Sequence, residues 1–242
     1  MNTYRPLSYD ESEILRTEMA STDVDETIRV IDHVRVTRRH LQRLRPYYRE
    51  EAGTSQRSYY LSDEIINTYL ALLSERAAAD PTRLGSVFLF NSYLYSRLVA
   101  NGYKFENVSG FFAEKGSPFD YEFVLLPISE HFHWTIFVIQ PRIKQICYYD
   151  SLKYSNPKRM RTVKAYLDNM HRKHHAGKGI KWSEWKEVVP KDFPTQPDAV
   201  NCGVFVLSIA NYTLQKMKID IDLTRLNDMR RIINYQLIMG GI

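Results

Sequence analysis

The segment FPTQPDAVNCGVFVLSIANY, residues 193–212, passes from a polar loop with two prolines into a nearly unbroken apolar stretch. The apolar stretch predicts a buried helix, and Cys202 stands at its first turn. A thiol there lies at the positive end of the helix dipole, beside backbone N–H groups that lack partners within the helix, and both favour the thiolate. Cys202 could instead be a small packed residue, but its position after a polar loop favours a functional role. The other cysteine, Cys147, lies between apolar strand residues, and we expect it to be inert core.

Short runs rich in β-branched and aromatic residues precede this segment at 121–128, 134–140 and 145–151, and we predict a fourth short strand at 186–190. Turn residues bound these runs, which is typical of strands. Helical patterns surround them, at 61–76, 87–102, 157–175, 202–217 and 226–239. Helices on both sides of a compact block of strands predict an α+β fold with one small central sheet.

The length of 242 residues suits one domain, and no linker divides the strand block from its helices. We therefore expect a single domain over 34–242. Residues 1–33 are polar and lean acidic, so we expect an arm or a short helix there, partly disordered near its start.

Composition and charge narrow the class of protein. No run of eighteen apolar residues exists and the N-terminus lacks the order of a secretory signal, so we expect no membrane association. Two cysteines form neither a disulfide framework nor a four-cysteine zinc site, which favours an intracellular location, nuclear or cytoplasmic. A net charge of +5 is too mild to indicate nucleic acid as a partner, and we expect a monomer.

A thiolate nucleophile needs a base, and the base needs an acceptor that orients it. His133 stands where a loop meets a predicted strand, and Asp150 ends the next apolar strand. Neighbouring strands can carry these two side by side, and the helix beginning at Cys202 then completes a cluster. Acyl transfer also needs donors for an oxyanion, and Gln196 and the backbone N–H of Cys202 are candidates. Alone, this order of residues also occurs by chance, and Gln196 could be an ordinary loop amide.

Two further features concern ligands. Gly203 has no side chain, which leaves room for a substrate backbone to come close to the thiol. His171, His174 and His175 lie in the basic pattern at 157–175 and suit a metal only loosely, since no cysteine or carboxylate partner stands nearby. We read them as a solvated face and expect neither a metal nor a cofactor.

Taken together, the motifs resemble the ULP/SENP-type (sentrin-specific) cysteine proteases of the adenain-like clan, which process SUMO and related ubiquitin-like modifiers. The resemblance runs from about residue 34 to the C-terminus and is carried by VTRRHLQRL, YLSDEIINTYLALL, VFLFNSYLYSRLVANGY, HWTIFVI, YYDSL and QPDAVNCGVF. It implies a papain-like/adenain-like cysteine protease fold, with a small central mixed sheet flanked by helices, and a single ULP-type protease domain over 34–242.

The resemblance also implies catalytic roles. His133 would be the general base, selected over His131 by the HW pair, and Asp150 would orient it. Cys202 would be the nucleophile, and Gln196 would line the oxyanion hole. The implied reaction is cleavage after the C-terminal Gly-Gly of SUMO or a related modifier, without a cofactor.

Modifier-binding roles follow from the same resemblance. Trp134 would cover a narrow channel for the Gly-Gly tail, with Phe112 closing the channel from the other side, and Asp63 would pair with a basic residue of the modifier. The chain departs from the family pattern at Tyr60, which replaces a tryptophan. It departs again before the nucleophile, where aspartate and asparagine have exchanged places at residues 198 and 201, and in a longer loop at 46–58.

These departures affect residues that face the modifier more than residues that do the chemistry, so other functions stay open. The partner could be ubiquitin or NEDD8, as in relatives on the same fold that bacteria secrete into host cells. The chain could also be an acetyltransferase of the same clan, or an inactive module that binds a modifier. The HW pair and the six-residue step from Gln196 to Cys202 favour the protease over the acetyltransferase, and the complete set of His133, Asp150 and Cys202 argues against an inactive module. The match of LSDEIIN and FNSYLYSRL to relatives that act on SUMO favours SUMO as the modifier.

Overall fold

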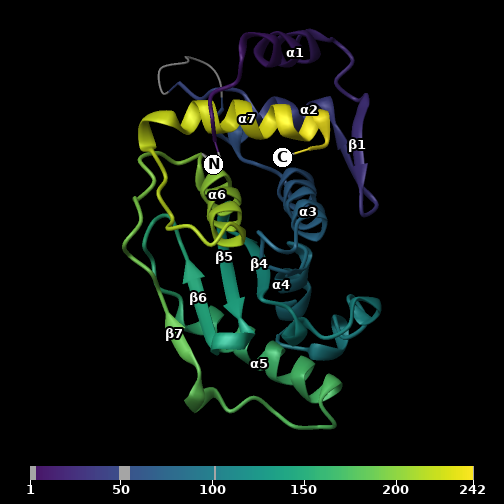
Figure 1. Cartoon of the computed structure of the whole chain (residues 1–242), viewed down its shortest axis with the longest axis vertical. Helices are drawn as coiled ribbons and strands as arrows, with labels where there is room; N and C mark the ends of the chain where they lie inside the picture. Colours follow the sequence, from purple (N-terminus) through teal and green to yellow (C-terminus); the bar gives the residue numbers. More distant parts are fainter. Residues whose placement is uncertain (1–3, 49–54, 101, 242) are drawn as a thin grey trace.

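A mixed sheet of five strands forms the centre of the computed structural model, which describes residues 4–48, 55–100 and 102–241 (Figure 1). The strands are β3 (Val87–Leu89), β4 (Phe123–Glu130), β5 (His133–Gln140), β6 (Gln145–Tyr149) and β7 (Lys186–Val188), and they lie in that order. β4, β5 and β6 are antiparallel, while β3 runs parallel to β4 and β7 runs parallel to β6. The predicted α+β class with a small mixed sheet is confirmed.

Helices cover both faces of this sheet and create two hydrophobic cores. One face packs against α3 (Asp63–Ala79) and α6 (Cys202–Leu214), which are backed by α7 (Leu226–Met239). The other face packs against α4 (Tyr93–Val99) and α5 (Pro157–His174). In Figure 1, α6 stands between the sheet and α7, which lies across the top of the molecule. Strands buried on both faces read as continuous apolar runs, which explains the sequence of β4 and β5.

The segment 87–102 differs from the predicted single helix. Its first residues form strand β3, in which Phe88 pairs with Val124 of β4, and helix α4 begins only at Tyr93. In a short run of apolar residues, the hydrophobic periodicity cannot distinguish a buried strand from a buried helix. Here the pairing with β4 makes the first residues a strand.

The N-terminal residues belong to the same folded body. Helix α1 (Tyr9–Ala20) packs against α7, and β1 (Thr27–Ile31) pairs with β2 (Val34–Thr37) across the predicted boundary at residue 34. Tyr4 is 1% exposed and lies in the first core, so residues 4–33 are no free arm. Residues 1–3, where we expected disorder, and residues 49–54 of the predicted loop lie outside the described residues.

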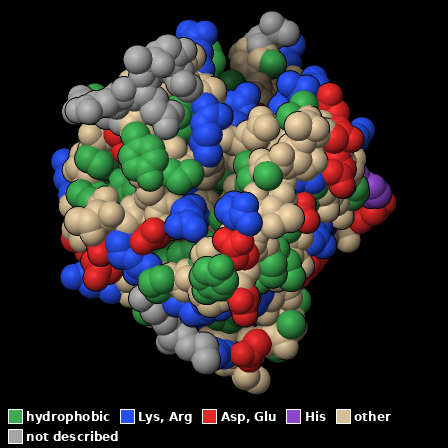
Figure 2. All heavy atoms as spheres, turned by 90° about the horizontal axis from the view of Figure 1, so that it is seen from above, with side chains coloured by type: hydrophobic (Ala, Val, Ile, Leu, Met, Phe, Trp, Pro, Cys, Tyr) green, Lys and Arg blue, Asp and Glu red, His purple; other side chains and the backbone are tan. Residues whose placement is uncertain are grey.

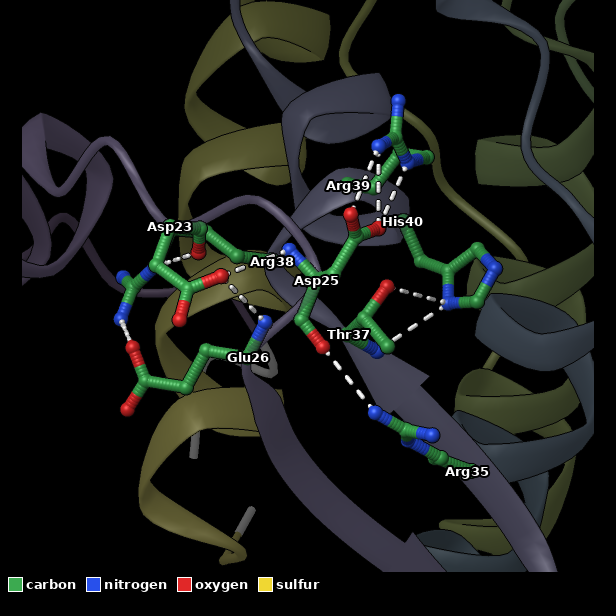
Figure 3. A network of polar contacts seen from close by, with 8 residues as sticks. All are labelled: Asp23, Asp25, Glu26, Arg35, Thr37, Arg38, Arg39 and His40. Atoms are coloured by element: carbon green, nitrogen blue, oxygen red, sulfur yellow. Dashed lines mark hydrogen bonds and ion pairs between the residues drawn. The ribbon is translucent and has the colours of Figure 1, made fainter.

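A buried arginine at the start of the short helix α2 (Arg38–Leu41) fastens this N-terminal segment (Figure 3). Arg38 is 3% exposed and donates to the carboxylates of Glu26 at 2.6 Å and Glu18 at 3.1 Å. The next residue, Arg39, pairs with Asp25 at 2.9 Å, but both of these side chains are exposed. Figure 3 shows both ion pairs, Arg38 with Glu26 and Arg39 with Asp25.

Charge on the surface is mixed. On the face seen from above in Figure 1, basic and acidic side chains are interspersed (Figure 2). None of the helices among the described residues is long and apolar enough to cross a membrane.

The adjacent arginines make a matched pair for a stability test. We expect Arg38→Ala to lower the free energy of unfolding by about 2 kcal/mol, because it removes a buried side chain together with its hydrogen bonds to Glu18, Asp23 and Glu26. Arg39→Ala should change it by less than about 0.5 kcal/mol, since exposed ion pairs contribute little. Urea denaturation measures both values, and equal losses in the two variants would contradict the assignment of Arg38 as the fastening residue.

Candidate active site

The pairing of β5 with β6 brings a histidine and an aspartate to the same end of the sheet. His133 begins β5, Asp150 directly follows β6, and Ile136 pairs with Tyr149 just before that end. Nε2 of His133 lies 2.8 Å from Oδ1 of Asp150. Asp150 is 4% exposed, and the same oxygen accepts the backbone N–H of Leu152 at 2.8 Å. The backbone of Leu152 therefore holds the carboxylate of Asp150 in place, and this carboxylate orients the imidazole ring of His133.

Cys202 completes the arrangement from the other side of the ring. It is the first residue of α6, and its side chain lies close enough to the His133 ring to help raise the pKa of that ring. Because Nε2 faces Asp150, Nδ1 is the nitrogen that faces the thiol. Burial lowers the pKa of His133, but the hydrogen bonds and charges of Asp150 and Cys202 outweigh burial and raise it to about 9. The ring thus carries a proton at neutral pH, ready for a leaving group.

Gln196 lies in the loop before α6 and is 6% exposed. Its side-chain oxygen accepts from the hydroxyl of Ser151, the residue after Asp150, and its side-chain nitrogen donates to the backbone carbonyl of Asp198 at 2.6 Å. An amide nitrogen carries two hydrogens, so one remains for a ligand. The first N–H groups of a helix, including that of Cys202, have no acceptor within the helix. Gln196 and the start of α6 together offer the donors that a developing oxyanion needs.

The second cysteine and the neighbouring histidine lie outside this group. Cys147 is 3% exposed on β6, where burial raises the pKa of its thiol. His131 is exposed in the turn between β4 and β5, two residues before His133. Of the two cysteines and these two histidines, the structure thus brings Cys202 and His133 together and places Cys147 and His131 elsewhere.

Trp134 follows the base and is fixed against the start of α3. Its indole Nε1 donates to the backbone carbonyl of Leu61 at 2.8 Å, and the side chain is only 3% exposed. Tyr60, the residue before Leu61, is partly buried, and its ring centroid lies 6.4 Å from that of Phe132 in the turn next to His133. Trp134 therefore follows His133 in β5, and Tyr60 packs beside the turn that precedes His133.

Phe112 does not reach this region. It lies in the second core, on the opposite face of the sheet from Cys202, with its ring 4.9 Å from that of Phe90. Tyr60 is the aromatic that the structure brings to the site in its place. The signal for it was present in the sequence, because Tyr60 occupies the position of the family's tryptophan directly before LSD.

Asp63 begins α3 and is partly exposed. One of its carboxylate oxygens accepts from the hydroxyl of Ser92 at 2.6 Å. A carboxylate has two oxygens, so this bond orients Asp63 and leaves the other oxygen for a cationic partner.

Gly203 has a role other than the predicted one. The residue is buried, and a Cβ atom added to it would lie 2.9 Å from three side-chain carbons of Leu61. The absent side chain makes room for Leu61, which lets the start of α6 approach the segment that holds Trp134. Gly203 is therefore a packing residue, and the expected space for a substrate backbone is already filled.

A thiol, an imidazole and a carboxylate in hydrogen-bonding sequence at a helix start define a cysteine-nucleophile site. A model of the "Ulp1 protease family, C-terminal catalytic domain" matches residues 59–238, and the chain belongs to this family. The matched range contains His133, Asp150, Gln196 and Cys202.

The curated relatives are longer proteins. The chain is 31% identical over 160 residues to ubiquitin-like-specific protease ESD4 of Arabidopsis thaliana, covering 64% of this chain and 32% of that protein. It is 26% identical over 190 residues to human sentrin-specific protease 2, covering 78% of this chain and 29% of that protein. The chain thus spans about a third of the length of these two relatives.

Solved structures share the fold. The Ulp1 protease domain in complex with Smt3, the yeast orthologue of SUMO, has a TM-score of 0.75 at 19% identity, covering 98% of this chain and 97% of that one. A SUMO protease Ulp1 with its catalytic cysteine oxidised to a sulfonic acid has the same TM-score at 21% identity, covering 98% of both chains. Among the residues that the structure describes, no group of three or more His, Cys, Asp or Glu side chains is placed to hold a metal ion.

Gly203 can be tested against another glycine. We expect Gly203→Ala to lower the free energy of unfolding by about 1–3 kcal/mol, because the added methyl group overpacks the contact with Leu61. Gly110→Ala is the matched control, since a Cβ atom there meets nothing within 4 Å. Thermal and urea denaturation measure the difference, and a Gly203→Ala protein as stable as the wild type would refute the packing role.

The raised pKa of His133 can be measured by NMR titration of the ring. We expect a midpoint near pH 9 in place of the ordinary 6.5, and a lower midpoint in Asp150→Asn, which removes the negative partner. A pKa raised on folding stabilises the protein fully below about pH 6.5, and this contribution is lost as the pH rises through about 9. A ring that titrates near 6.5 in the folded protein would contradict the pairing with Asp150.

Proposed function

We propose that this chain is a cysteine isopeptidase that removes SUMO from its conjugates by cleaving after the C-terminal Gly-Gly. The observation that carries the proposal is the hydrogen bond of His133 to the buried Asp150, with Cys202 at the start of α6 interacting with the same ring and Gln196 in the loop that leads to Cys202. The relatives support SUMO as the modifier, since they include sentrin-specific proteases and a Ulp1 domain solved with the yeast SUMO orthologue.

The reaction follows from the geometry in two halves. In the first, the sulfur of Cys202 attacks the carbonyl carbon of the modifier's last glycine, and His133 gives its proton to the leaving lysine amine as the C–N bond breaks. In the second, His133 accepts a proton from water as the water attacks the thioester, which breaks the C–S bond, frees the glycine carboxyl group and restores the free sulfur of Cys202 beside the protonated ring. Gln196 and the N–H of Cys202 stabilise the oxyanion in both halves, at about 3 kcal/mol for each donor.

Selectivity for Gly-Gly would come from a channel too narrow for side chains. Trp134 and Tyr60 are its walls in this proposal, because both lie beside the base and rigid aromatic rings exclude larger groups at little entropic cost. Asp63 would bind a basic residue of the modifier outside the channel. We propose further that the protein needs no cofactor and acts as an intracellular monomer, in the nucleus or the cytoplasm.

Modifier probes that end in an electrophile test the proposal. We expect a SUMO probe to form a covalent adduct with the wild type and with Cys147→Ala, and no adduct with Cys202→Ala, because only Cys202 has a base. A SUMO probe with alanine in place of the last glycine is the control for the channel and should react far more slowly.

Ubiquitin and NEDD8 probes separate the modifier from the chemistry. Rapid labelling by either one, with none by SUMO, would overturn the SUMO assignment and leave the isopeptidase standing. If no probe labels a folded protein whose Cys202 reacts with iodoacetamide, the isopeptidase proposal is wrong.

A further inference from the structure

A fully buried arginine on α7 lies close to the nucleophile, although the reaction described above does not use it. Arg230 is 0% exposed. Its guanidinium donates to the side-chain oxygen of Asn201 at 2.7 Å and to the backbone carbonyls of Arg45 at 2.9 Å and Tyr59 at 2.7 Å, and it also bonds to the carbonyl of Arg43. A buried charge is costly unless its hydrogen bonds are satisfied. The guanidinium has five N–H donors, and four oxygen atoms accept from it. These acceptors belong to three separate chain segments.

The contact with Asn201 leads to the oxyanion donor. Asn201 is the residue before Cys202, and its side-chain nitrogen donates to the carboxylate of Asp198 at 2.6 Å. The other oxygen of that carboxylate accepts the backbone N–H of Asn201 at 2.9 Å, which shapes the turn into α6. The backbone carbonyl of Asp198 accepts from Gln196 at 2.6 Å. A continuous set of hydrogen bonds thus joins the guanidinium to Gln196 and to the start of α6.

The contact with Tyr59 leads to the opposite side of the site. Tyr59 lies two residues before Leu61, whose backbone carbonyl accepts from the indole of Trp134. Arg230 therefore stands where the segment before α3 meets the start of α6, and it bonds to both. Loss of the guanidinium would release the two segments from each other.

The positive charge of Arg230 and the negative charge of Asp198 fix the orientation of the amide group between them. Burial lowers the pKa of Arg230 to about 10, against the raising effect of the negative charges of Asp198 and Cys202, so the guanidinium stays charged at neutral pH. The neutral side-chain amide of Asn201 lies between the guanidinium of Arg230 and the carboxylate of Asp198, and it hydrogen-bonds to both. An amide accepts at one end and donates at the other, so it fits only in this orientation.

We propose that Arg230 is a positioning residue for the nucleophile, acting through Asn201 and Asp198 on the start of α6 and on Gln196. Its role in catalysis rests on the proposed isopeptidase function. The arrangement requires one carboxylate and one amide at residues 198 and 201.

Exchanging the two side chains tests this requirement. Asn201→Asp places a second carboxylate within 2.6 Å of the first. Asp198→Asn brings an N–H group of the new amide against an N–H group of Asn201 and removes the negative charge near Arg230. We expect each to lower kcat/KM on a fluorogenic SUMO substrate by about a hundredfold through kcat, with KM little changed, because the modifier surface is untouched. The double variant Asp198→Asn/Asn201→Asp restores one carboxylate and one amide, and should recover most of the loss.

A pair of neighbouring arginines provides the control. Arg230→Gln should slow both turnover and alkylation of Cys202 by iodoacetamide at neutral pH, followed by mass spectrometry. Arg231→Gln removes the same charge from a partly exposed position one residue along α7, and should leave both rates unchanged. If Arg230→Gln does not fold, the exchange series decides alone.

Three results would overturn the proposal: wild-type kcat in both single variants, no recovery in the double variant, or equal alkylation rates for a folded Arg230→Gln and the wild type. Failure of the isopeptidase function is distinguishable, because alkylation needs no modifier. In that case the wild type cleaves no modifier, while the variants of residues 198, 201 and 230 still differ from it in alkylation rate.

Discussion

The antiparallel register of β5 with β6 is the constraint on which the site depends. It places His133 and Asp150 at one end of the sheet, from residues 17 positions apart in the chain. A shift of one residue would turn one of the two side chains to the opposite face and separate them. The register is strongly specified because both faces of β5 are buried, with Ile136 and Val138 in one core and Phe137 in the other.

On each face of the sheet, a buried arginine hydrogen-bonds to a residue next to the site. Arg159 of α5 donates to the hydroxyl of Tyr148 at 2.6 Å, and that hydroxyl lies 3.5 Å from the second oxygen of Asp150. Arg230 of α7 bonds to Asn201, next to the nucleophile. The two arginines approach from opposite faces of the sheet, so the acid and the thiol are each held by a polar network within an otherwise apolar layer.

Close packing joins these networks. The absent side chain of Gly203 admits Leu61, whose backbone carbonyl in turn receives the indole of Trp134. The start of α6, Trp134 and the segment before α3 are therefore joined by packing and by a hydrogen bond. Such rigidity suits a nucleophile that must lie within contact distance of a carbonyl carbon, since small displacements are costly in rate.

The sequence alone determined which residues are candidates for the site and much of the architecture of this protein. Apolar runs predicted β4, β5 and β6, and Cys202 at a helix start, His133 before a strand and Asp150 after one are local features that a pattern can reveal. The tertiary structure decided against Phe112 as the second aromatic of the site, because Phe112 packs in the second core while Tyr60 packs beside the turn before His133. It also decided that residues 87–89 form a strand and that Gly203 serves Leu61. The bonds of Arg230 were equally hidden, because they join residues up to 187 positions apart and no local pattern records such a contact.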